Sequence, residues 1–158
     1  MKLFIKRDIS DPKSMFTIFD ELGREKYYSL NLKSKSNKTF AITDLQRNVI
    51  VKIRQIPFGG AKSFVFKAGK SHITFVIAIT SKGVYSNFYG NNWHINGEIA
   101  SKNYSIVDVD NTVIAINKNQ GNQCELTVYD SNNELYSIAT SVCINMLNTV
   151  DKLAIQAV

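Results

Sequence analysis

The chain has 158 residues, of which 44% are hydrophobic and 20% are charged, and its formal net charge is +6. A chain of this length buries roughly 68–70% of the surface that it exposes when unfolded, so it can fold without a disulfide or a metal. The composition is that of an ordinary globular protein, rich in the residues that favour strands. We therefore expect one domain over residues 1–158, with no cofactor.

The first residues, MKLFIKRD, carry charges after a short apolar run and lack the apolar core of a signal peptide. No later stretch reaches the roughly eighteen apolar residues of a membrane-spanning helix. Both features favour a cytoplasmic protein.

Cys124 and Cys143 have no metal-type spacing, so we expect two reduced, buried thiols and no metal site.

Short strands are predicted along most of the chain, because apolar residues alternate with polar ones between clusters of Gly, Pro, Asn and Asp. In chain order the predicted strands are Lys2–Arg7, Phe16–Asp20, Tyr27–Leu32, Phe40–Asp44, Val49–Gln55, Lys62–Lys67, His72–Thr80, Val84–Tyr89, Trp93–Ile99, Tyr104–Asp108, Thr112–Asn117 and Leu126–Asp130. Turn residues at such short intervals favour a meander of hairpins rather than βαβ units.

The pattern Phe-x-Ile-x-Asp occupies residues 16–20 and again residues 40–44, and a related pattern ends at Asp108 and at Asp130. It predicts a strand whose alternate apolar residues point one way. The Asp at its end can accept hydrogen bonds from the backbone of the turn that follows.

The segment from Glu134 to Gln156 is predicted to be a helix, because apolar residues cover most of its circumference. One polar row shares a single face: Ser137, Ser141, Asn145, Asn148, Lys152 and Gln156. A helix that is apolar nearly all round favours burial within a sheet. The alternation from Ile138 to Met146 leaves a strand open as an alternative, as it does a helix outside an open sheet. We expect an all-β protein with one helix: a closed antiparallel barrel of about twelve strands around a hydrophobic C-terminal helix.

The order of these patterns resembles the LURP-one-related family of the tubby C-terminal-like superfamily. The resemblance rests on FTIFDELGREKYYSL, FAITDLQRNVIVKIRQ, WHINGEIASKNYSIVD and TVIAINKN, followed by the apolar helix, and it covers nearly the whole chain. It implies a twelve-stranded barrel threaded by that helix. Relatives in the superfamily include phosphoinositide-binding tubby domains and phospholipid scramblases.

Positive charge is concentrated in residues 1–70, which hold 15 Lys and Arg against 6 Asp and Glu. Lys52 and Arg54 lie two apart on a predicted strand, so they project from one face. Phosphoinositide-binding tubby domains use a Lys-x-Arg pair of this form. Lys33, Lys35 and Lys38, in the Ser/Asn-rich loop that follows Leu32, add charge nearby. The alternative is an ordinary solvated strand face.

Catalytic readings find little support, and we expect no enzyme and no catalytic residue. His72 and His94 each stand alone in a predicted strand, without a nucleophile motif. Nucleic acid is not expected either, because the aromatic residues alternate inward.

The sequence therefore predicts a non-enzymatic binding module that recognises anionic phospholipid headgroups or another phosphorylated ligand, peripheral at the membrane when it binds lipid. The alternative is a structural or regulatory protein-interaction barrel, whose partner the sequence does not name.

Overall fold

The computed structural model describes residues 1–8, 14–32, 38–58 and 60–147. They form twelve strands, a short 3-10 helix and one α-helix. The strands are β1 (Lys2–Arg7), β2 (Ser14–Phe19), β3 (Glu25–Leu32), β4 (Thr39–Thr43), β5 (Val49–Phe58), β6 (Ala61–Ala68), β7 (Ser71–Thr80), β8 (Gly83–Tyr89), β9 (His94–Glu98), β10 (Asn103–Val107), β11 (Val113–Asn119) and β12 (Gln123–Val128). The 3-10 helix η1 (Ser131–Asn133) leads into α1 (Glu134–Asn145).

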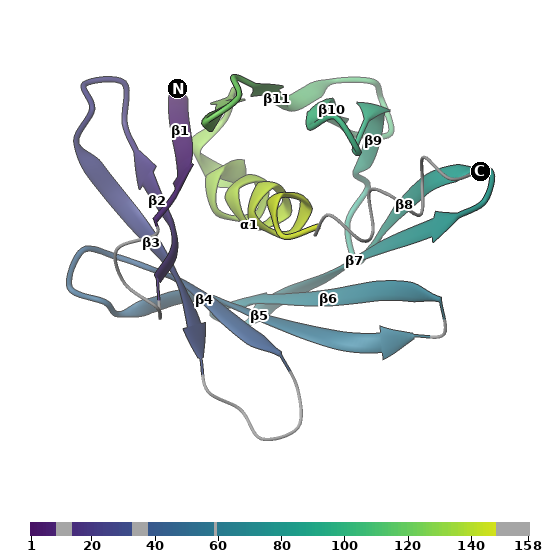
Figure 1. Ribbon diagram of the computed structural model, residues 1–158, viewed down its shortest axis with the longest axis horizontal. Coiled ribbons are helices and arrows are strands. Elements are labelled where there is room, and N and C mark those ends of the chain that lie inside the picture. Colours follow the sequence, from purple (N-terminus) through teal and green to yellow (C-terminus); the bar gives the residue numbers. More distant parts are fainter. Residues whose placement is uncertain (9–13, 33–37, 59, 148–158) are drawn as a thin grey trace.

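The twelve strands form a single antiparallel sheet in which consecutive strands pair, apart from β8 and β9, and in which β1 also pairs with β12. This last pairing sets Lys2 opposite Thr127 and bends the meander into the barrel seen in Figure 1. The predicted barrel of about twelve strands is confirmed. It is nearly closed: β8 and β9 lie at the two ends of the strand order, and no backbone ladder joins them within the described residues.

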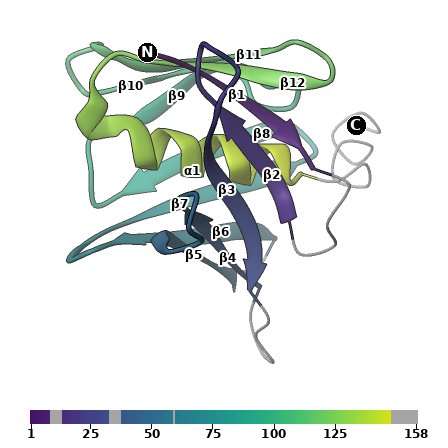
Figure 2. The same cartoon turned by 90° about the vertical axis from the view of Figure 1, so that its left-hand side faces the viewer.

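Helix α1 lies inside the barrel, as predicted, and contacts β5 and β6 on one side and β11 and β12 on the other (Figures 1 and 2). Every residue from Ser137 to Ile144 is buried. Enclosure on every side buries the polar residues Ser137, Thr140 and Ser141 together with the apolar ones. The alternatives of a strand or of a helix outside the sheet are therefore excluded.

The helix ends at Asn145, and the backbone N–H of Met146 closes its last turn on Val142 and Cys143. The predicted helix from Glu134 to Gln156 is therefore wrong at Met146, which is a turn residue, and at Leu147, which belongs to no helix or strand. The remainder of that prediction, residues 148–158, lies outside the described residues. The apolar periodicity continues past the point where the backbone leaves the helix, so the pattern alone could not locate this end.

Ser141 and Asn145, two residues of the predicted polar row, form a buried network with β11 and β12. Asn117, an inward residue of β11, accepts a hydrogen bond from Ser141 Oγ at 3.0 Å and donates one to the Lys102 carbonyl at 2.8 Å. Asn145 donates to the Ser141 carbonyl at 2.8 Å and accepts from Cys124 Sγ at 3.4 Å. Because buried polar atoms are costly without partners, this network fixes the rotation of α1 in the barrel.

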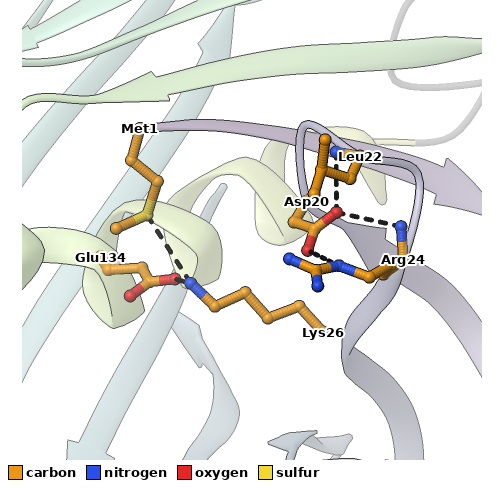
Figure 3. Close-up of polar contacts among 6 residues, drawn as sticks. All are labelled: Met1, Asp20, Leu22, Arg24, Lys26 and Glu134. Carbon is orange, nitrogen blue, oxygen red and sulfur yellow. Dashed lines mark hydrogen bonds and ion pairs between the residues drawn. The ribbon is translucent and has the colours of Figure 1, made fainter.

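The predicted strand-end aspartates do accept hydrogen bonds from their turns. Asp44 Oδ1 accepts from the backbone N–H of Gln46 at 3.0 Å and of Asn48 at 2.9 Å. Asp20 and Asp108 repeat both bonds to the second and fourth residues that follow them. Figure 3 shows the Asp20 turn, where Arg24 also forms an ion pair with the carboxylate at 2.8 Å. These hydrogen bonds lower the pKa values of Asp20 and Asp44, the backbone N–H of the fourth residue contributing most.

Three of these turns share one backbone shape, with a left-handed residue three positions after the Asp: Gly23 (φ 76°), Arg47 (φ 65°) and Asn111 (φ 62°). Each is also preceded by a register shift in the strand pair. Strands β2, β4, β10 and β12 all end at the same end of the barrel, because neighbours are antiparallel. We name this the Asp-turn end, defined by Asp20, Asp44, Asp108 and Asp130.

The N-terminus of α1 lies at the Asp-turn end. Glu134, at the first helical position, accepts a hydrogen bond from Lys26 Nζ of β3 at 2.6 Å (Figure 3). Burial and the neighbouring Glu134 carboxylate raise the pKa of Tyr27 to about 12. The start of the helix is therefore fixed to β3 by an ion pair, whereas farther along it is fixed to β11 by neutral hydrogen bonds.

Both cysteines are buried and unbridged, as predicted. Burial raises the pKa of the Cys143 thiol well above its ordinary value. A protonated thiol behaves as a small apolar group, so Cys143 contributes packing to the core.

Candidate functional site

Lys52 and Arg54 both project from the outer face of β5. Their side chains are exposed, while Val51 and Ile53 between them are fully buried against the helix side. This arrangement is the one that period-two alternation predicts. The predicted role of the pair in binding stays a prediction, and so does that of the three loop lysines.

The structure separates Lys38 from this pair. Lys38 precedes β4, and its carbonyl accepts a hydrogen bond from the Gln55 backbone N–H at 2.9 Å. Its side chain lies at the mouth of a cavity at one end of the barrel, not on the outer face. Lys33 and Lys35 lie outside the described residues.

Two further groups that the sequence analysis did not assign extend the Lys52 and Arg54 pair. Lys67 of β6 lies directly opposite Lys52, and His72 of β7 lies directly opposite Lys67. All four side chains are exposed. We name these residues, Lys52, Arg54, Lys67 and His72, the outer basic face. Strand pairing between β5, β6 and β7 brings them together, and that pairing was not deduced from the sequence.

A second cationic group lies at the end of the barrel opposite the Asp-turn end. Here Arg7, Lys38 and Lys62 line a cavity of about 250 Å³, and we name this region the cationic end. The cavity also has polar and apolar lining residues: Asn31, Phe40, Gln55, Phe64, Cys143, Met146 and Leu147. None of the described lining residues is Asp or Glu.

Arg7 of β1 and Lys62 of β6 occupy inward positions of their strands, and Lys38 continues the inward series of β4 one residue before that strand begins. In the alternation of each strand, the next inward residue is buried and apolar: Ile5 beside Arg7, Phe40 beside Lys38 and Phe64 beside Lys62. A charge at the last inward position of an otherwise apolar series is the signal that could have revealed this group from the sequence. The sequence analysis did not assign these three cations, because it used the alternation only to identify buried apolar residues.

Local contacts hold the cavity wall in place. The guanidinium of Arg7 lies 5.8 Å from the centre of the Phe16 ring, within the range of a cation–π contact. Cys143 of α1 and the two residues beyond the helix, Met146 and Leu147, form the floor, where the Leu147 N–H donates to the Ile144 carbonyl at 3.2 Å. The cavity is therefore bounded by the barrel wall on one side and by the end of the buried helix on the other.

The part of the chain that the structure describes contains no cluster of side chains typical of a catalytic or metal site. No group of three or more His, Cys, Asp or Glu side chains converges there on a possible metal position. His72 and His94 lie on β7 and β9, which are not paired. The strand-end aspartates are occupied by their turns. Among the described residues, no helix has the length and apolarity needed to cross a membrane.

Comparison with known proteins agrees with this architecture. The chain is similar to the X-ray structure of a protein from Arabidopsis thaliana, with a TM-score of 0.65 and 12% sequence identity, over 93% of this chain and 91% of that chain. At this identity the likeness establishes the fold alone. No curated protein matches the sequence. The sequence profile described as LURP-one-related matches residues 1–146. The chain therefore belongs to the LURP-one-related family, as the order of its strand patterns predicted.

Proposed function

We propose that this protein is a binding module that recognises anionic phospholipid headgroups through its outer basic face. The observation that carries the proposal is the register of β5 and β6, which sets Lys52 directly opposite Lys67, with Arg54 two residues along the same face. The barrel fold of the family supports a binding role. The Lys-x-Arg form of the pair supports a phosphorylated ligand.

Like charges directly opposite each other across a strand pair destabilise a sheet. A solvated face with no other role would gain from an acidic partner at one of these positions. The residues paired with Lys52 are Ala41 and Lys67, and those paired with Arg54 are Thr39 and Val65. Within the described residues, Lys52 and Arg54 form no ion pair. A negatively charged headgroup supplies the missing counter-charge.

Simple attraction to a membrane is too weak to account for stable binding. Each Lys or Arg close to an anionic membrane contributes about 1 kcal/mol, so Lys52, Arg54 and Lys67 together contribute about 3 kcal/mol. A complex with a dissociation constant of 1 mM requires about 4.1 kcal/mol. Direct hydrogen bonds to a phosphate, worth about 1.5–3 kcal/mol each, must supply the rest. We therefore expect preference for headgroups with exposed phosphates over lipids with a single diffuse charge.

The test is co-sedimentation of the full chain with phosphatidylcholine vesicles that contain increasing amounts of phosphoinositide, at low and at physiological salt. We expect binding by the wild type, weakened by salt because exposed charges are screened. The Lys52→Ala/Arg54→Ala variant should bind much less. Its stability should change by no more than about 0.5 kcal/mol, because both side chains are exposed.

The matched control is Lys6→Ala/Lys118→Ala, which removes two exposed lysines from outward positions of β1 and β11. It changes the net charge equally but leaves the outer basic face intact. Absence of wild-type binding at low salt would reject the proposal and favour the protein-interaction alternative. Equal loss in both double variants would show attraction by net charge rather than recognition at this face.

A further inference from the structure

The cavity at the cationic end has the composition of an anion-binding site. Three of its described lining residues carry positive charge, two carry side-chain amides, and none is acidic. Because Arg7, Lys38 and Lys62 come from β1, from the residue before β4 and from β6, no single stretch of sequence contains the group. The closed sheet order brings it together.

The helix terminus accounts for only part of this charge. The C-terminus of α1 borders the cavity, and the macrodipole places a negative charge of about 0.5 there. Arg7 and Lys38 alone carry more than this, and both side chains are exposed at the cavity mouth. A site with surplus positive charge and low-dielectric walls concentrates anions.

We propose that this cavity binds a phosphate monoester. Such a group carries a charge of about −1.5 to −2 at pH 7 and three strong acceptor oxygens. The planar guanidinium of Arg7 suits two of these oxygens, and Lys38 supplies a point charge. The amides of Asn31 and Gln55 line the same cavity and can donate to a remaining oxygen.

The volume of the cavity and its aromatic lining limit what the rest of the ligand can be. A volume of about 250 Å³ is below the roughly 300–1,000 Å³ of pockets that enclose drug-sized molecules. It accommodates a phosphate with a short carbon skeleton, which would pack against Phe40 and Phe64. The phosphate monoester comes either from a soluble metabolite or from the headgroup of a lipid.

This site is independent of the outer basic face. Lys52 and Arg54 project outward from β5, whereas Gln55 of the same strand lines the cavity. Substitutions in the two groups should therefore separate. A substitution that abolishes binding at one site should leave binding at the other site unchanged. Failure of the proposal for one site can therefore be told apart from failure of the proposal for the other.

The test uses the full chain and sn-glycerol 3-phosphate, titrated calorimetrically, with glycerol as the uncharged control. We expect binding of the phosphate ester and none of glycerol. Arg7→Gln and Lys38→Gln should each weaken binding by about tenfold or more, since each removes a charge-assisted hydrogen bond worth about 1.5–3 kcal/mol. Lys6→Gln/Lys118→Gln, which removes two outward charges, and Lys52→Gln/Arg54→Gln should both bind as the wild type does.

Phosphatidylcholine vesicles with and without phosphatidic acid, a lipid phosphate monoester, distinguish the source. Binding of glycerol 3-phosphate without binding of the vesicles indicates a soluble ligand. Binding of the vesicles, lost in Arg7→Gln/Lys38→Gln and kept in Lys52→Gln/Arg54→Gln, indicates a lipid headgroup. The proposal is overturned if the wild type binds neither probe, or if Arg7→Gln/Lys38→Gln binds as tightly as the wild type.

The position of the bound ligand can be read directly from NMR spectra. Addition of glycerol 3-phosphate should shift the side-chain amide signals of Asn31 and Gln55, and the backbone signals of Leu147. The backbone signals of Lys67 and His72 should stay in place. Shifts confined to the outer basic face would place the ligand there and reject the cavity as its site.

Discussion

The two ends of the barrel use charge in opposite ways. At the Asp-turn end, the carboxylates of Asp20, Asp44 and Asp108 accept hydrogen bonds from the backbone of their own turns, so each charge is matched within a few residues. At the cationic end, Arg7 and Lys38 face a shared cavity with no acidic residue among its described lining. Locally matched charge serves the fold, whereas by our proposal the charges of Arg7 and Lys38 serve a ligand.

Helix α1 connects the two ends, so breaking its core should remove both. Ile138 is fully buried. We expect Ile138→Asp to abolish folding. The lost apolar contacts cost about 2–5 kcal/mol, and a buried carboxyl group without a partner adds to this cost. The sum approaches the whole free energy of unfolding of a domain, which is about 5–15 kcal/mol. Circular dichroism and calorimetry should show no cooperative transition. Ile138→Val is the control and should cost only about 0.5–1.5 kcal/mol. A cooperative melt of the Asp variant near the wild-type temperature would contradict the enclosed position of the helix.

The helix is fixed by buried hydrogen bonds near the cationic end, and the loss of one should be measurable. Asn117→Ala removes the acceptor of Ser141 Oγ and the donor to the Lys102 carbonyl. We expect the free energy of unfolding in urea to fall by about 1–3 kcal/mol, because buried partners are left unsatisfied. Lys118→Ala, the exposed neighbour, should change it by no more than about 0.5 kcal/mol. Equal losses of stability in the two variants would mean that the buried hydrogen bonds of Asn117 do not stabilise the fold.

The two ends should respond differently to single charge removals. Asp108→Ala removes the acceptor of two backbone N–H groups, so we expect the free energy of unfolding to fall by about 1 kcal/mol, with glycerol 3-phosphate binding unchanged. Asp108→Asn keeps an acceptor oxygen and should be milder. Arg7→Gln should show the reverse: weaker binding and nearly unchanged stability. Urea titration and calorimetry on the same preparations would measure both, and stability losses of equal size at the two ends would remove the distinction.

The smallest expected effect is a dependence of stability on acid at the Asp-turn end. The pKa values of Asp20 and Asp44 in the folded protein lie below their ordinary value of 3.8. A carboxyl group with a lowered pKa contributes stability above its unfolded pKa, and this contribution is lost as the pH falls through the folded pKa. Melting temperatures measured from pH 7 down to pH 2 should therefore fall below about pH 4. Asp20→Asn/Asp44→Asn should flatten this decline, and an unchanged decline would assign it to other carboxylates.

Several features of this protein follow from its sequence because their causes are local. Alternation located all twelve strands to within a few residues, and the Asp at the end of the Phe-x-Ile-x-Asp pattern predicted the bonded turns after β2 and β4. Both signals are read from residues at most four apart in the sequence. The outward position of Lys52 and Arg54 was predictable for the same reason, as was the buried helix that begins at Glu134.

Other features were decided only by tertiary structure, because they depend on which strands meet. The pairing of β1 with β12 brings together residues that are far apart in the sequence, and among the described residues no ladder joins β8 to β9, so the barrel is only nearly closed. The place of Lys67 beside Lys52 depends on the register of β5 and β6. Arg7 and Lys62 share a cavity because the inward positions of distant strands converge where α1 ends. Alternation states that a side chain points inward, but only the closed sheet determines what it meets there.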